Sequence, residues 1–145
     1  MKTRYGVMLV ILAILIIPLY NCSGTGGPND NVGVSPFVGN WAGTWTDSNG
    51  QSGTFSLNIS SLGTMTGSIY NATLSETASV SAGFIDGNGN FNFTITYPGP
   101  TIYTASGTAS VNNLGNLVGS FKEYSGATLI ATITFTLSNT APPNG

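Results

Sequence analysis

Between Trp41 and Leu137, apolar residues recur at every second position within a series of short runs, and this alternation limits most strongly how the chain can fold. It is clearest in residues 91–97, where aromatic and branched side chains take every odd position. A period of two is that of a β-strand with one buried face, whereas a helix repeats every 3.6 residues. The sequence therefore predicts an all-β domain. The other runs of this kind are Trp41, Gly43 and Trp45; Phe55, Leu57 and Ile59; Met65, Gly67 and Ile69; Ala78, Val80, Ala82 and Phe84; Tyr103, Ala105 and Gly107, followed by Ala109 and Val111; Leu117, Gly119 and Phe121; and Leu129, Ala131, Ile133, Phe135 and Leu137.

Segments rich in Gly, Asn and Asp separate these runs at near-regular intervals. Such residues allow the positive φ angles of tight hairpin turns, so each strand is expected to pair antiparallel with the next. The result is an up-and-down meander of about eight strands, which can avoid exposed edges as a closed barrel or as a two-sheet sandwich. We favour a small closed barrel, because glycines inside the predicted strands let them bend and coil tightly. These glycines are Gly43, Gly67, Gly107 and Gly119.

The first residues have the layout of an export signal. Lys2 and Arg4 precede an unbroken apolar run over residues 7–17, which ends at Pro18. A positive segment followed by a short apolar one is typical of a secretory signal peptide. The run is also shorter than the roughly 20 residues that a membrane-spanning helix needs.

Cys22 directly follows this leader and is the only cysteine in the chain. With Leu19 three positions before it and a glycine-rich segment after it, the stretch resembles the lipobox of bacterial lipoproteins. The resemblance implies that Cys22 is acylated and that the leader is removed before it. Tyr20 and Asn21 depart from the small residues usual at these positions, which leaves open an uncleaved membrane anchor or cleavage elsewhere.

The predicted organisation follows from these features. Residues 1–21 are a lipoprotein signal peptide, residues 22–36 a flexible tether rich in Gly and Pro, residues 37–140 the barrel, and residues 141–145 a disordered tail. The predicted location is the bacterial cell envelope, where the lipid holds the protein at the periplasmic face of the outer membrane or at the cell surface. Two acyl chains hold a protein stably on a bilayer, whereas one chain is marginal.

The composition argues against several classes of function. The chain has no histidine, which excludes His-based triads and His metal ligands. With Cys22 assigned to the anchor, thiol chemistry is excluded as well, so we expect no enzyme, no catalytic residues, no metal site and no cofactor. Without the leader, Lys122 is the one basic residue against five carboxylates. Such a domain neutralises few phosphates, so nucleic acid is not an expected partner.

The first predicted strands resemble the opening hairpin of the avidin family. The likeness rests on residues 43–45, residues 53–55 after a polar turn, and residues 63–68; the Gly-x-Trp start is also similar to lipocalin-like barrels. Avidins hold biotin between a polar set and a box of Trp residues. The resemblance places Asp47 and Ser52 near polar ligand contacts and Trp45 near the aromatic ones, but Ile69 stands where a Tyr hydroxyl is expected. Because the later strands lack Trp, biotin binding is not expected.

The period of two places many large apolar side chains inside the barrel, so we expect a filled interior in which Trp41 and Trp45 belong to the core. The carboxylates show no pairing in the sequence, and Glu123, next to Lys122, is expected to be solvated. The leading hypothesis is a non-enzymatic, lipid-anchored barrel that binds a small apolar ligand or an envelope protein. The alternative is a structural or adhesive surface module with a filled barrel and no small-molecule ligand.

Overall fold

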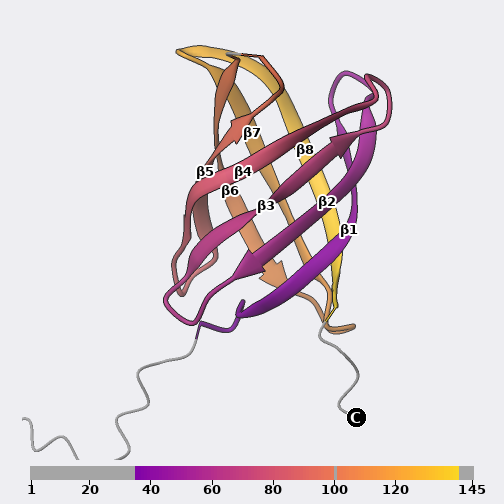
Figure 1. Cartoon of the computed structure of the whole chain (residues 1–145). Coiled ribbons are helices and arrows are strands. Elements are labelled where there is room, and N and C mark those ends of the chain that lie inside the picture. The colour runs from indigo at the N-terminus through magenta and orange to yellow at the C-terminus, as the bar shows by residue number, and fades with distance from the viewer. Residues whose placement is uncertain (1–34, 100, 141–145) are drawn as a thin grey trace, which may run out of the picture. The chain divides into compact units, whose positions relative to one another are not determined.

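The computed structural model describes residues 35–99 and 101–140, which include all of the predicted barrel domain except residue 100 (Figure 1). The predicted signal peptide, the lipidation site Cys22, nearly all of the tether and the C-terminal tail lie outside the described residues.

Eight antiparallel strands form a closed barrel, in which each strand pairs with the next and β1 pairs with β8 (Figure 1). The closing pair aligns Trp45 of β1 with Phe135 of β8. The prediction of an all-β, up-and-down closed barrel is thus confirmed, and the sandwich is excluded. The strands are β1 (Gly39–Asp47), β2 (Ser52–Ile59), β3 (Thr64–Asn71), β4 (Glu76–Ile85), β5 (Asn90–Thr96), β6 (Ile102–Val111), β7 (Leu117–Ser125) and β8 (Thr128–Asn139).

Four of the turns, those after β1, β2, β4 and β6, are built in the same way. In each, a side-chain oxygen accepts hydrogen bonds from the backbone N–H groups two and four residues further on. A glycine follows at the third position with a φ of 76° to 86°, a conformation that side chains disfavour. The spacing of Asp, Asn or Ser before Gly therefore sets where each strand ends. The accepting residues are Asp47, Ser60, Asp86 and Asn112.

The interior is filled by aromatic side chains, as predicted. The rings of Phe55, Phe91, Phe93, Phe121 and Phe135 lie with centroids 5.1 to 6.2 Å apart, mostly in tilted or edge-to-face arrangements. Edge-to-face contacts place the positive ring edge against the negative face of the neighbour, which stabilises the cluster beyond the area it buries.

One end of the barrel is closed by the residues that lead into β1. The indole Nε1 of Trp41 donates a hydrogen bond to the backbone oxygen of Phe37 at 2.8 Å, and both side chains are buried. Trp41 thus belongs to the core, as predicted. We call this the closed end, and the other end, where β1 meets β2 and β7 meets β8, the open end.

The prediction of which β4 residues point into the barrel is wrong for the second half of the strand. Ala78 and Val80 are buried as expected, but the β4–β5 register shifts between Ser81 and Phe84. A β-bulge adds one residue to a strand and so inverts the alternation beyond it. Ala82 has a φ of 50° at this point, and Phe84 is 48% exposed while its neighbour is buried. A second register shift, between β7 and β8, leaves Leu129 exposed, although the predicted run places it inside.

Candidate functional site

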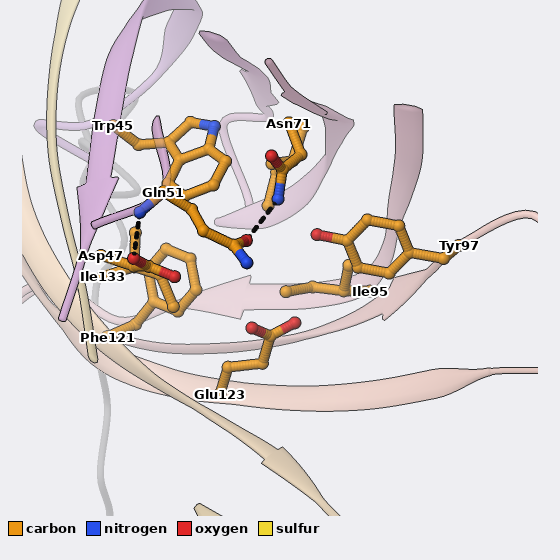
Figure 2. A pocket seen from close by; sticks show the side chains of 10 residues that line it. Trp45, Asp47, Gln51, Asn71, Ile95, Tyr97, Phe121, Glu123 and Ile133 are labelled. Atoms are coloured by element: carbon orange, nitrogen blue, oxygen red, sulfur yellow. Dashed lines mark hydrogen bonds between the residues drawn. The ribbon is translucent and has the colours of Figure 1, made fainter. Parts of the chain in front are cut away.

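The inward alternation changes from apolar to polar as the strands reach the open end. In most strands, β8 excepted, the run that fills the core continues for one more step and ends on a side chain that carries oxygen or nitrogen. Together with neighbours from the turns, these polar and aromatic side chains surround a hollow, which we call the mouth (Figure 2). The mouth residues are Asp47, Gln51, Asn71, Glu76, Tyr97, Tyr103 and Glu123.

The hollow has an outer and an inner part. The outer part has a volume of about 320 Å³, near the lower limit of roughly 300 Å³ for small-molecule sites. The inner part holds about 20 Å³, which is room for about one water molecule. Trp45 lies at the floor, where its Nε1 donates to the backbone oxygen of Tyr70 at 3.1 Å. A ligand therefore has space at the mouth but not within the aromatic core.

Asn71 connects two of the turns at the open end. Its side chain is 1% exposed, and its Nδ2 donates to Gln51 Oε1 at 2.6 Å (Figure 2). Its Oδ1 accepts the backbone N–H groups of Thr73 and Leu74 at 3.0 and 3.1 Å. Because a buried amide is costly unless it is hydrogen-bonded, these contacts hold the side chain and the β3–β4 turn in place.

Asp47 organises the other side of the mouth. Its Oδ1 accepts the backbone N–H groups of Asn49 at 2.9 Å and Gln51 at 2.7 Å. These bonds close the β1–β2 turn, and in this turn Gln51 presents its side chain to Asn71 (Figure 2). The mouth is therefore preorganised by hydrogen bonds from β1 to β3.

Glu123 lies opposite this network and differs from it. Its side chain is 9% exposed, yet no hydrogen bond or ion pair reaches its carboxylate from residues 35–99 or 101–140. In that part of the chain no fully enclosed side-chain oxygen or nitrogen lacks a partner, so the Glu123 oxygens must open onto the hollow. Figure 2 shows the carboxylate pointing into the same space as Gln51 and Tyr97.

The electrostatics of the mouth follow from burial and from its negative charges. Burial, with a further contribution from the Asp47 charge, raises the pKa of Glu123 to about 6. Burial also raises the pKa of Tyr97 to about 12; the Glu123 charge acts in the same direction, and a hydrogen bond with Asn71 opposes it. At neutral pH the mouth thus holds an ionised Glu123 and a protonated Tyr97 hydroxyl.

Aromatic rings form the side of the mouth that β5 and β6 provide. The Tyr97 and Tyr103 rings pack edge to face, with centroids 5.7 Å apart and an interplanar angle of 86°. Both side chains line the outer hollow, and Leu74 and Ile130, which are 53% and 40% exposed, extend its rim. The mouth therefore combines one buried negative charge with aromatic and apolar surface.

The structure brings together two of the three residues proposed for ligand contact. Trp45 and Asp47 both line the inner hollow, and Trp45 is 5% exposed. Ser52, by contrast, is exposed on the outer face and is not among the residues that line the mouth.

Asp47 is the one mouth residue proposed from the sequence; the residues missed are Gln51, Asn71, Glu76, Tyr97, Tyr103 and Glu123. The expectation that Glu123 is solvated beside Lys122 is wrong: successive strand residues point to opposite faces, so Lys122 is exposed while Glu123 is buried. The sequence did contain a signal for two of these residues. Asn71 lies two positions after Ile69, and Glu123 lies two positions after Phe121, so the same alternation that buries Ile69 and Phe121 also places Asn71 and Glu123 on the inner face.

Among residues 35–99 and 101–140, no group of three or more His, Cys, Asp or Glu side chains is arranged to hold a metal ion. The same residues contain no helix long and apolar enough to cross a membrane.

No protein-family model, curated protein or solved structure matches the chain.

Proposed function

We propose that this protein is a lipid-anchored envelope protein of bacteria whose barrel binds a small molecule at its open end without catalysing a reaction. The anchor is inferred from the leader and Cys22 alone, since both lie outside the described residues. The binding activity is inferred from the mouth.

One observation carries the binding proposal: the barrel is filled along most of its length but opens at one end into a hollow lined by polar side chains. A core that served only stability gains nothing from a buried Glu123 without a hydrogen bond, because a charged group costs free energy when it leaves water unpaired. A concave site with apolar walls and a few convergent polar groups is the usual form of a small-molecule site. The mouth is therefore suited to a ligand whose polar group enters the hollow and whose apolar part contacts the rim.

A second function is favoured by a separate observation. Outside the mouth the interior is filled, and the outer surface carries rows of hydroxyl side chains, some bonded across strands, such as Thr46 with Thr134 and Ser56 with Ser68. A structural or adhesive surface module would use this outer face. It would bind no small molecule at the mouth, and substitutions in the mouth would leave its activity unchanged.

Changing Cys22 to Ser is expected to move the protein from the membrane fraction to the soluble fraction, because a serine cannot carry the thioether-linked lipid that the anchor needs. Fractionation of cells grown with labelled fatty acid measures both effects, and the variant should carry no label. Ser23→Ala is the control for a change at the junction, and it should stay labelled and membrane-bound. Label that remains on the Cys22→Ser variant would contradict the proposal.

A further inference from the structure

The chain supplies no counter-charge to the carboxylate in its mouth. Glu123 is nine-tenths buried and has no hydrogen bond or ion pair within the described residues. Lys122 is the only Lys or Arg in that part of the chain, and it lies exposed on the outer face. Asp47, on the other side of the inner hollow, adds negative charge to the same space. Buried charges are normally paired, so this one is available to a cation from solution.

The surface around the carboxylate suits an organic cation. The Tyr97 and Tyr103 rings lie beside the outer hollow, and aromatic faces attract ammonium groups through their negative π-surface. Leu74 and Ile130 at the rim offer apolar contact to the rest of such a molecule. The hollow of about 320 Å³ limits the ligand to a small one.

We propose that the mouth binds a small protonated amine with an apolar body, and that Glu123 is the group that pairs with its ammonium charge. This rests on the proposed function, and it names the ligand class. The ammonium group donates hydrogen bonds to the Glu123 carboxylate, and the apolar body lies between the tyrosine rings and the rim. An ammonium group has up to three N–H donors and no acceptor, which matches a carboxylate that accepts none from the protein.

A bare metal ion fits the mouth less well. Calcium takes six to eight oxygen ligands, and among the described residues no group of three or more His, Cys, Asp or Glu side chains is arranged to hold a metal ion. One oxygen of Asp47 already accepts two backbone N–H groups. An ammonium group needs only one such carboxylate and gains from the aromatic wall.

Binding should also depend on pH. The pKa of Glu123 is raised to about 6, so the carboxylate loses its charge, and the amine its partner, as the pH falls below that value. The other titratable groups that face the hollow are Asp47, Glu76, Tyr97 and Tyr103. Tyr97 stays protonated in this range because its pKa is about 12. Weaker binding at pH 5 than at pH 7.5 is therefore expected to come from Glu123.

The test uses the full chain in neutral detergent, with 2-phenylethylammonium as the probe and uncharged 2-phenylethanol, which has nearly the same shape, as its control. Nuclear magnetic resonance follows the side-chain amides of Gln51 and Asn71, which report on the mouth. The amine should shift these signals at pH 7.5 and bind about tenfold or more tightly than the alcohol, as expected for a charge-assisted hydrogen bond.

Two variants with the same change in net charge complete the test. Glu123→Gln should weaken amine binding about tenfold or more and abolish its preference over the alcohol. Asp86 lies at the closed end, and asparagine keeps the oxygen that accepts the turn hydrogen bonds. The Asp86→Asn variant should therefore bind the amine as tightly as the parent protein does. Equal weakening by both variants would show a general charge effect and overturn the inference.

The failure of this inference is distinct from the failure of the proposed function. If amine and alcohol bind equally well at the mouth and Glu123→Gln changes neither, the site binds small molecules but does not select cations. If neither probe shifts the mouth signals, both the cation site and small-molecule binding are overturned.

Discussion

Replacing Phe55 with alanine is expected to lower the free energy of unfolding by about 3–5 kcal/mol, the range for truncating a fully buried large aromatic residue. Phe55 is 1% exposed and lies at the centre of the filled interior. Its ring centroid is 6.1 Å from those of Phe93 and Phe121 and 5.6 Å from that of Phe135. Alanine would leave a cavity among rings on three other strands, and the loss approaches the whole stability of a marginal domain.

Phe84→Ala is the matched control for this change. Phe84 is 48% exposed on the outside of the β4 bulge, so the same truncation there should cost less than about 1 kcal/mol. Urea unfolding of the two variants measures the difference. A similar, small loss for both would show that the interior is not a packed aromatic core.

Replacing Gly107 with alanine is expected to cost about 3 kcal/mol or more, at the upper end of the range for overpacking. A Cβ at this position would lie 2.0 Å from the backbone oxygen of Ser120 and 2.6 Å from the Cα of Phe121. Both are backbone atoms of β7, so no side chain can move aside, and the β6–β7 pairing must shift. Gly107 thus allows the two strands to approach closely beside the aromatic cluster.

Gly87→Ala provides the comparison, because a Cβ there meets nothing within 4 Å. Its effect should stay within about 0.5 kcal/mol, and it can be slightly stabilising because alanine restricts the unfolded chain. Thermal unfolding followed by circular dichroism separates the two substitutions. Equal melting temperatures would mean that β6 and β7 do not approach as closely as the structure indicates.

The architecture of the barrel could be predicted from the sequence because alternation and turn chemistry agree along nearly the whole domain. Phe55, Leu57 and Ile59 are all buried, as their spacing predicts, and the turns at Asp47 and Asp86 end strands where expected. Local patterns suffice for this fold, since each strand pairs with its neighbour in the chain and β1–β8 is the only strand pairing between distant segments of the described barrel.

The β4 bulge could not be predicted in the same way. It includes Ala82 with a positive φ, a conformation that the residue type does not favour and that the sequence therefore does not indicate. Since a single inserted residue inverts every side chain beyond it, Phe84 lies on the surface and not in the predicted core.

The candidate site was only partly predictable, because polar residues were judged by residue type and not by their place in the alternation. Glu123 next to Lys122 is typical of a solvated pair, but the period of two that buries Phe121 also buries Glu123. The resemblance to avidins predicted ligand contacts at Asp47 and Ser52. The structure places Asp47 in the mouth but Ser52 on the outer face.

The burial of an ionised Glu123 without a partner in the protein is tested most directly by the free energy of unfolding as a function of pH. The pKa of Glu123 is about 6 in the folded chain and near its ordinary value of 4.5 in the unfolded chain. Below pH 4.5 the Glu123 carboxyl is protonated in both the folded and the unfolded chain, so its ionisation does not lower the free energy of unfolding. As the pH rises to about 6 the unfolded state ionises first, and about 1–2 kcal/mol of stability is lost and stays lost at higher pH.

The measurement is urea unfolding of the parent and of Glu123→Gln, in the absence of added amine, from pH 4 to pH 8. Glutamine has nearly the same shape and cannot ionise, so the two proteins should be similarly stable at pH 4. Above pH 6 the variant should be more stable by about 1–2 kcal/mol. A variant that is less stable than the parent at pH 7.5 would show that the carboxylate has a stabilising partner within the chain, and would contradict the assignment of an unpaired, buried charge.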